Sequence, residues 1–250
     1  MISIVPAVLL GLFTTPAATF KFFTTTDFSY ELNFWEVFTD ISFFNCVWWR
    51  ILLKFAGIVI FTSIAVGVID RDMKVGDFNL KKPLEFLNDN LLVVFPIVTI
   101  MFGVFVLGQF IISALIVLWQ LILPGAFLWM SIATSALVYI VVLLLFAVSL
   151  AWAAEAIETG RSLGKALAEA LRNVRGKTVS LLLGIMLPIP VLLAISHLTA
   201  FYNIEVAWLI NIVVYLFVYT YFVSYAFTSY YELCGLERED LNKINIWKRR

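Results

Sequence analysis

Residues 91–154 read LLVVFPIVTIMFGVFVLGQFIISALIVLWQLILPGAFLWMSIATSALVYIVVLLLFAVSLAWAA and contain no Asp, Glu, Lys, Arg or His. About 20 apolar residues suffice to cross a bilayer as a helix, so this run must cross twice. The tripeptide Leu-Pro-Gly at 123–125 interrupts the pattern, and a tryptophan flanks it on each side. We therefore predict a helical hairpin made of residues 91–122 and 126–154 that turns at one membrane face.

The composition of the whole chain agrees with a membrane location. Of its 250 residues, 62% are hydrophobic and 14% are charged, and the mean hydropathy is +0.99. Ordinary soluble domains are roughly 45–50% apolar and about 25% charged. The apolar residues form long runs rather than the short alternating segments of a β-barrel. The fold class predicted is all-α, a polytopic transmembrane helix bundle, and the formal net charge of zero gives no reason to expect a nucleic-acid partner.

Hydropathy divides the chain into a single transmembrane domain, residues 1–250, with six spans and two surface helices. The six spans are expected at residues 2–22, 47–69, 91–122, 126–154, 178–200 and 206–231. Amphipathic patterns predict interfacial helices at residues 33–45 and 161–175. The charged segment 70–90 is expected to be a loop, with Pro83 able to start a helix that continues through Leu84, Phe86 and Leu87 into the third span.

The distribution of Lys and Arg predicts the orientation. With six spans, fourteen of the seventeen cations fall on the side that holds residues 70–90, residues 155–177 and the C-terminal tail. Cytoplasmic segments carry the excess of Lys and Arg. Both termini are therefore expected in the cytoplasm and the turn at 123–125 outside. Cys46 is then expected at the outer interface and Cys234 at the inner one.

The sequence lacks the residues from which membrane enzymes and ion-coupled transporters build their sites. The middle of every predicted span is free of charge, and no P-loop, HExxH motif or membrane carboxylate pair is present. Two cysteines and one histidine, His197, form no metal-binding or haem-binding pattern. We therefore expect no enzyme activity, no metal and no cofactor, and we interpret His197 as an interfacial residue.

Basic side chains mark the places where lipids or a partner are expected to bind. Arg50 and Lys54 lie one turn apart near the start of the second span. Either they extend to the nearby interface, or they face inward and bind an anionic lipid or a partner's carboxylate. A second basic set lies on the predicted surface helix, where each cation near an anionic membrane contributes about 1 kcal/mol. That set comprises Arg161, Lys165, Arg172, Arg175 and Lys177.

A groove is the other candidate site. Pro188 and Pro190 must kink or break the fifth span. The sixth span is rich in tyrosine, and such a row of aromatic residues either packs against neighbours or lines a groove. The candidate groove residues are Gln109, His197, Asn211, Tyr215 and Tyr219.

Three segments carry a family resemblance. They are DRDMKVGD at 70–77 with LNDN at 87–90, the basic segment 161–177, and SYYELCGLERED at 229–240. Together they resemble a family of uncharacterised six-helix bacterial integral membrane proteins, and more loosely the membrane domain attached to some glycerophosphodiester phosphodiesterases. The resemblance implies the cytoplasmic (inner) membrane of a bacterium. No phosphodiesterase domain accompanies it here, so that activity is not implied.

Two functions fit these observations. The first is a non-enzymatic accessory or scaffolding subunit that associates with another membrane protein or with anionic lipid headgroups at the cytoplasmic face. The alternative is a transporter or lipid-handling protein with a groove between the kinked fifth helix and the tyrosine-rich sixth helix. A cavity at mid-membrane depth favours the alternative, whereas a tight bundle with a flat apolar outer face favours the accessory subunit.

Overall fold

The computed structural model describes residues 6–8, 22–23, 26, 28, 31–41, 48–75, 83–198 and 204–236. Within these ranges all regular structure is α-helical, so the all-α class is confirmed. The helices whose bounds fall within these ranges are α3 (Phe34–Ile41), α4 (Trp48–Val75), α5 (Pro83–Ile122), α6 (Phe127–Thr159), α7 (Leu163–Val174), α8 (Thr178–Met186), α9 (Pro188–Leu198) and α10 (Ile204–Cys234). The predicted span at 2–22 and Cys46 lie outside the described residues, apart from short pieces of that span.

Five stretches of the described chain are long and apolar enough to cross a bilayer, so the protein is a multi-pass membrane protein. They are Ile51–Val75, Pro83–Ile122, Phe127–Thr159, Thr178–Ile195 and Val206–Cys234. The fourth of these runs through α8 and α9 together. Many of their large apolar side chains are exposed, as expected for helices whose outer faces contact lipid.

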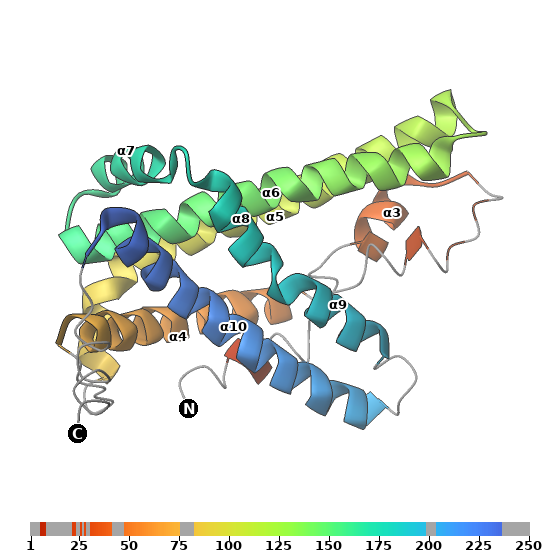
Figure 1. Cartoon of the computed structure of the whole chain (residues 1–250). Helices are drawn as coiled ribbons and strands as arrows, with labels where there is room; N and C mark the ends of the chain where they lie inside the picture. Colours follow the sequence, from red (N-terminus) through yellow and green to blue (C-terminus); the bar gives the residue numbers. More distant parts are fainter. Residues whose placement is uncertain are drawn as a thin grey trace, which may run out of the picture.

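The hairpin of α5 and α6 is the central element of the described bundle, and most of the other helices pack against it (Figure 1). Pro124 and Gly125 lie in the turn between the helices, where Ala126 N–H donates to the carbonyl of Leu123. Close contact between the arms depends on small residues, because a Cβ at Gly108 would lie 2.8 Å from Val142. The helix α3 packs on α5 near this turn through ring contacts of Phe34 and Phe38 with Phe110.

The remaining helices pack around the other end of the hairpin. The last turns of α4, α6 and α10 meet there beside α7 (Figure 1). A core cluster with Met73, Ala154 and Phe227 joins these last turns. The surface helix α7 lies on α6 through Ala166 and Ala170, and Trp152 Nε1 donates to the carbonyl of Leu163 at 2.8 Å.

Several helices continue past the limits that hydropathy suggested. The helix α4 runs to Val75 and α5 begins at Pro83, so the predicted loop at 70–90 begins and ends with helix, and α6 runs to Thr159. Hydropathy falls where charged residues begin, but a helix ends only where its backbone hydrogen bonds end. For α6 that point is Gly160, which has φ of +60° and closes the helix with a hydrogen bond to the carbonyl of Ala156. These additional turns of α4 and α6 bring charged side chains into contact with the rest of the protein.

Candidate functional site

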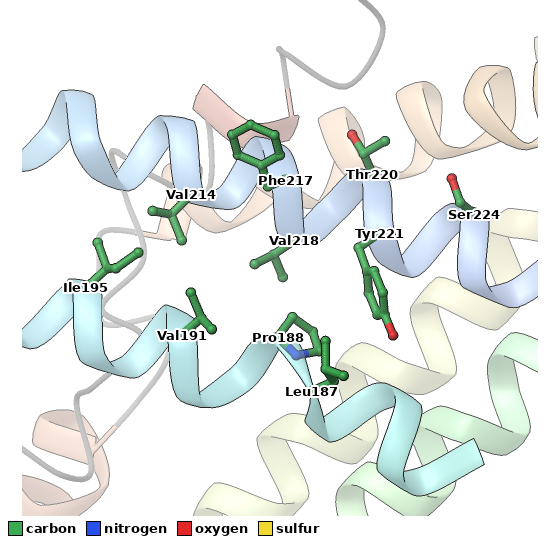
Figure 2. A pocket seen from close by; sticks show the side chains of 10 residues that line it. All are labelled: Leu187, Pro188, Val191, Ile195, Val214, Phe217, Val218, Thr220, Tyr221 and Ser224. Carbon is green, nitrogen blue, oxygen red and sulfur yellow. The ribbon is translucent and has the colours of Figure 1, made fainter. Parts of the chain in front are cut away.

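An open apolar groove runs between α9 and α10 where α8 gives way to α9 (Figure 2). Its cavity volume is about 520 Å³, within the roughly 300–1,000 Å³ typical of ligand sites. Its lining consists of Leu187, Pro188, Val191, Ile195, Val214, Phe217, Val218, Thr220, Tyr221 and Ser224. None of these ten side chains is charged. Their only polar groups are three hydroxyls.

The groove exists because Pro188 breaks the fifth span. Proline has no amide hydrogen, so the carbonyl of Gly184, four residues earlier, loses its usual helical donor. The helix α8 ends at Met186, and α9 begins at Pro188 in a new direction (Figure 1). An orphaned backbone carbonyl costs several kcal/mol inside a bilayer unless another group satisfies it.

A tyrosine from α10 supplies the missing hydrogen bond. The hydroxyl of Tyr221 donates to the Gly184 carbonyl at 2.8 Å. Tyr225, one turn further along α10, stacks on Tyr221 with ring centroids 5.6 Å apart and donates to the carbonyl of Leu181 at 3.3 Å. The two side chains therefore hold α10 against α8 and compensate for the broken helix.

Glycine at position 184 makes this contact possible. A Cβ there would lie 2.2 Å from the Tyr225 hydroxyl oxygen and 2.4 Å from its ring carbon Cζ. Such distances are far inside van der Waals contact, so any larger residue would displace the Tyr225 ring. Since that ring is also stacked and hydrogen bonded, Gly184 determines how closely α8 and α10 approach.

Both walls place the groove at mid-membrane depth. Residues 214–224 form the middle third of α10, which runs from 204 to 234. On the other wall, Leu187 lies ten residues beyond Lys177, about 15 Å along a helix at 1.5 Å per residue. That length equals half of the roughly 30 Å hydrocarbon core. With Lys177 at the interface, the groove therefore begins near the bilayer centre.

The candidate groove residues from the sequence are not among the ten that line this groove. Tyr215 and Tyr219 are buried on another face of α10, where the Tyr219 and Thr62 hydroxyls lie 2.7 Å apart. Gln109 is buried in α5, and Asn211 is half-buried in α10. His197 belongs to α9, but its side chain is outside the described part.

A second cluster of polar side chains lies at the α7 end of the bundle. Its members are Asp70 and Lys74 from α4, Glu155 and Glu158 from α6, and Arg161 from the α6–α7 connection; we call this cluster the charged junction. Lys74 Nζ lies 2.8 Å from Asp70 Oδ1 and 3.1 Å from Glu158 Oε2. The side chains of Glu155 and Glu158 are only 5% and 8% exposed. The junction thus ties α4 to α6 with charges that are largely shielded from water.

Glu155 has partners of its own. Arg161 Nη1 lies 3.7 Å from Glu155 Oε1, and Asn173 Nδ2 donates to Oε2 at 3.4 Å. Arg161 also pairs with Glu169 of α7. These contacts attach α7 to the end of α6.

The predicted lipid or partner residues fall into two groups. Lys165, Arg172, Arg175 and Lys177 are exposed on α7 or directly after it, while Arg161 takes part in the charged junction. Lys54 is instead buried in α4, at 1% exposed, and the side chain of Arg50 lies outside the described part.

Sequence reasoning missed Tyr221, Gly184, Asp70 and Glu158. The first two had a usable signal, because a proline within a span requires a replacement donor for the carbonyl four residues earlier. The two carboxylates had none, since 88 positions separate them and nothing local indicates that they meet. Within the described ranges, no group of three or more His, Cys, Asp and Glu side chains is placed to hold a metal ion.

Comparisons with protein-family models, curated proteins and solved structures each found no match to this chain.

Proposed function

We propose that this protein is a non-enzymatic lipid-handling membrane protein that binds an anionic phospholipid. An acyl chain occupies the groove between α9 and α10, and the headgroup binds the cations where α7 meets α8. The observation that carries the proposal is an open, uncharged groove between two segments that are long and apolar enough to cross a bilayer.

The occupant follows from the surroundings of the groove. An unfilled cavity forfeits the dispersion contacts of the atoms that line it, so an apolar groove open to the bilayer is filled. Acyl chains are the apolar material available at that depth. A polar or ionic substrate fits poorly, because transferring it to an uncharged apolar site costs several kcal/mol without compensating partners.

Selectivity has to come from the headgroup. Lipid tails are as apolar as leucine, so a tail gains no hydrophobic free energy on moving from the bilayer into the groove. The cations Arg175 and Lys177 are exposed at the corner between α7 and α8. Among the described residues no ion pair joins either of them to a carboxylate, in contrast to Arg172, which pairs with Glu169. Each cation near an anionic headgroup contributes about 1 kcal/mol.

The charge distribution supports a cytoplasmic position for this corner. Residues 155–177 lie on the side that carries fourteen of the seventeen cations, so α7 faces the inner leaflet and the turn at 123–125 faces outward. The family resemblance adds a bacterial inner membrane. In this orientation a lipid of the inner leaflet reaches the groove with the end of its chain.

Retention of lipid during purification tests the proposal. The protein is extracted in mild detergent from membranes containing phosphatidylglycerol, and bound lipid is counted by native mass spectrometry. We expect one retained anionic phospholipid, chemically intact. Val218→Trp fills the groove and is expected to reduce retention several-fold, whereas Val213→Trp alters an exposed, non-lining position of the same helix and is expected to leave it unchanged.

The headgroup contribution is tested separately. Arg175→Gln with Lys177→Gln is expected to abolish the preference for phosphatidylglycerol over phosphatidylcholine while leaving the groove intact. Equal retention in wild type, the groove variant and the double variant would exclude the proposal.

The accessory subunit stays as a second candidate because the hairpin is longer than the bilayer is thick. The apolar part of α5, residues 91–122, measures about 48 Å, against a hydrocarbon core of roughly 30 Å. Phe110, against which α3 packs, lies about 30 Å beyond Asn90. Beyond this level, near the turn, the side chains of Leu121 and Trp129 are 72% and 75% exposed. A partner protein at the outer face would cover this apolar tip.

Photo-crosslinking from the tip distinguishes the two candidates. A crosslinker placed at Leu121 is expected to form adducts with another protein in native membranes if the chain is an accessory subunit. The control is Leu92, which is 81% exposed at the opposite end of the same helix. Lipid adducts alone at both positions would leave only the lipid-handling function.

A further inference from the structure

The charged junction contains more negative than positive charge around Lys74. This lysine is the ion-pair partner of both Asp70 and Glu158, whose side chains are 18% and 8% exposed. Two carboxylates and one ammonium leave one uncompensated negative charge. Shielding a net charge from water is costly unless further partners neutralise it.

The two carboxyl groups differ in how many of their oxygens have a partner. Lys74 donates to Asp70 Oδ2 at 3.1 Å and lies 3.1 Å from Glu158 Oε2. Glu158 Oε1 is buried and has no hydrogen-bond partner among the described residues, whereas Asp70 Oδ1 lies 2.8 Å from Lys74 Nζ. The two carboxyl groups are brought together on one ammonium, because Lys74 Nζ lies 2.8 Å from Asp70 Oδ1 and 3.1 Å from Glu158 Oε2. Buried polar atoms without a partner are rare and call for an unseen donor.

Glu155 shows that burial alone does not create this deficit. Its side chain is slightly more buried than that of Glu158 and lies one turn earlier on the same helix. Yet Asn173 donates to one of its oxygens, and Arg161 pairs with the other. Glu155 therefore has a partner for each of its oxygens, whereas Glu158 has Lys74 at Oε2 and no partner at Oε1 among the described residues.

We propose that Glu158 binds a proton at neutral pH. Its O–H is then the donor to the Asp70 carboxylate, so a single proton removes the net charge and joins α4 to α6 by a carboxyl–carboxylate hydrogen bond. This site is independent of the groove and of the proposed lipid.

The other titratable groups that face Glu158 do not replace this proton. Among the described residues of α10, Tyr230 and Cys234 are the titratable groups beside it, and both are neutral or negative and bring no positive charge. Arg161 is engaged with Glu155 and Glu169. Loss of the proton would leave two carboxylates opposite one lysine and would push the ends of α4 and α6 apart.

Infrared difference spectroscopy tests the proposal directly. Titration of the purified protein in detergent is expected to show the C=O stretch of one protonated carboxyl at neutral pH. The band should disappear in Asp70→Asn and in Glu158→Gln. It should persist in Glu155→Gln, the matched control.

Thermal unfolding gives a second readout that does not rely on assigning the band. The proton is bound more tightly in the folded protein, so its contribution is present at low pH and is lost as the pH rises. The melting temperature of wild type is therefore expected to fall on going from pH 6 to about 9, whereas Glu158→Gln, whose amide donates an N–H to Asp70, flattens this fall. A missing carboxyl band, a band that survives both substitutions, or equal pH profiles for wild type and Glu158→Gln would overturn the proposal.

Discussion

At the groove and at the charged junction, a buried oxygen lacks its ordinary hydrogen-bond donor. At the groove it is the Gly184 carbonyl, because of Pro188, and at the junction it is Glu158 Oε1. The two oxygens are compensated in different ways. At the groove, Tyr221 donates to the Gly184 carbonyl that Pro188 leaves free. At the junction, no protein donor reaches Glu158 Oε1 among the described residues. The first arrangement is complete and neutral at every ordinary pH. The second depends on a proton from solvent, which is available near the membrane surface and scarce at mid-membrane depth.

The comparison indicates at which depth of the membrane each kind of polar group is tolerated. A hydroxyl that donates to a backbone carbonyl brings no net charge into the hydrocarbon region. Charged side chains are found where helices end and water can exchange with them. Substitutions at the two sites and on the surface of α7 should therefore differ in their cost.

Gly184→Ala should have the largest effect, because it separates α8 from α10. The added Cβ would clash with Tyr225, and overpacking of this kind costs about 1–3 kcal/mol. The matched control is Gly103→Ala in α5, where a Cβ meets no atom within 4 Å. Thermal unfolding in detergent should show a lower melting temperature for Gly184→Ala and an unchanged or higher one for Gly103→Ala. Equal melting temperatures would show that the tyrosine contact does not hold the helices together.

Lys74→Met should be the next largest, because it removes the one cation between two carboxylates. Lys74 is 40% exposed, so the cost should be about 1–2 kcal/mol, below that of a fully buried pair. Adding Glu158→Gln should restore most of the lost stability, since one carboxylate then remains. If the double variant is as unstable as Lys74→Met, repulsion between the carboxyl groups is not the cause.

Three tyrosines on α10 form a graded series that isolates the hydroxyl at the groove. Tyr221→Phe should cost about 1 kcal/mol, because the Gly184 carbonyl loses its donor. Tyr219→Phe should cost slightly less, since only the contact with the Thr62 hydroxyl is lost. Tyr215→Phe should be neutral or stabilising, as its buried hydroxyl has no partner in the described structure. Denaturant or thermal unfolding of the three variants provides the ranking, and a reversed order would contradict the role given to Tyr221.

Arg172→Gln should have the smallest effect. Arg172 pairs with Glu169 on the surface of α7, and its side chain is 75% exposed. Exposed pairs of this type contribute about 0–0.5 kcal/mol. A melting temperature within error of wild type is expected, and a large decrease would mean that α7 depends on surface charges rather than on Ala166 and Ala170.

The sequence by itself determined the all-α class and the multi-pass membrane character. Long charge-free runs are favourable only in a bilayer, whatever their neighbours, because transfer free energy depends on local composition. Pro188 and Pro190 likewise predicted a break in the fifth span, since proline acts on its own helix. The sequence offered a groove near the sixth helix only as an alternative to packing, with Tyr215 and Tyr219 as its candidate tyrosines. Tyr221 and Tyr225 form an equally regular pair on another face.

Only the tertiary structure decided which of these faces lines the groove and which carboxylates meet. A helix that is apolar all round has no preferred face, so its rotation is determined by packing against its neighbours. Gly184 and Pro188 allow Tyr221 and Tyr225 to approach, and that contact orients α10. Asp70 and Glu158 meet for the same reason, because the pairing of α4 with α6 depends on side-chain shape rather than on hydropathy.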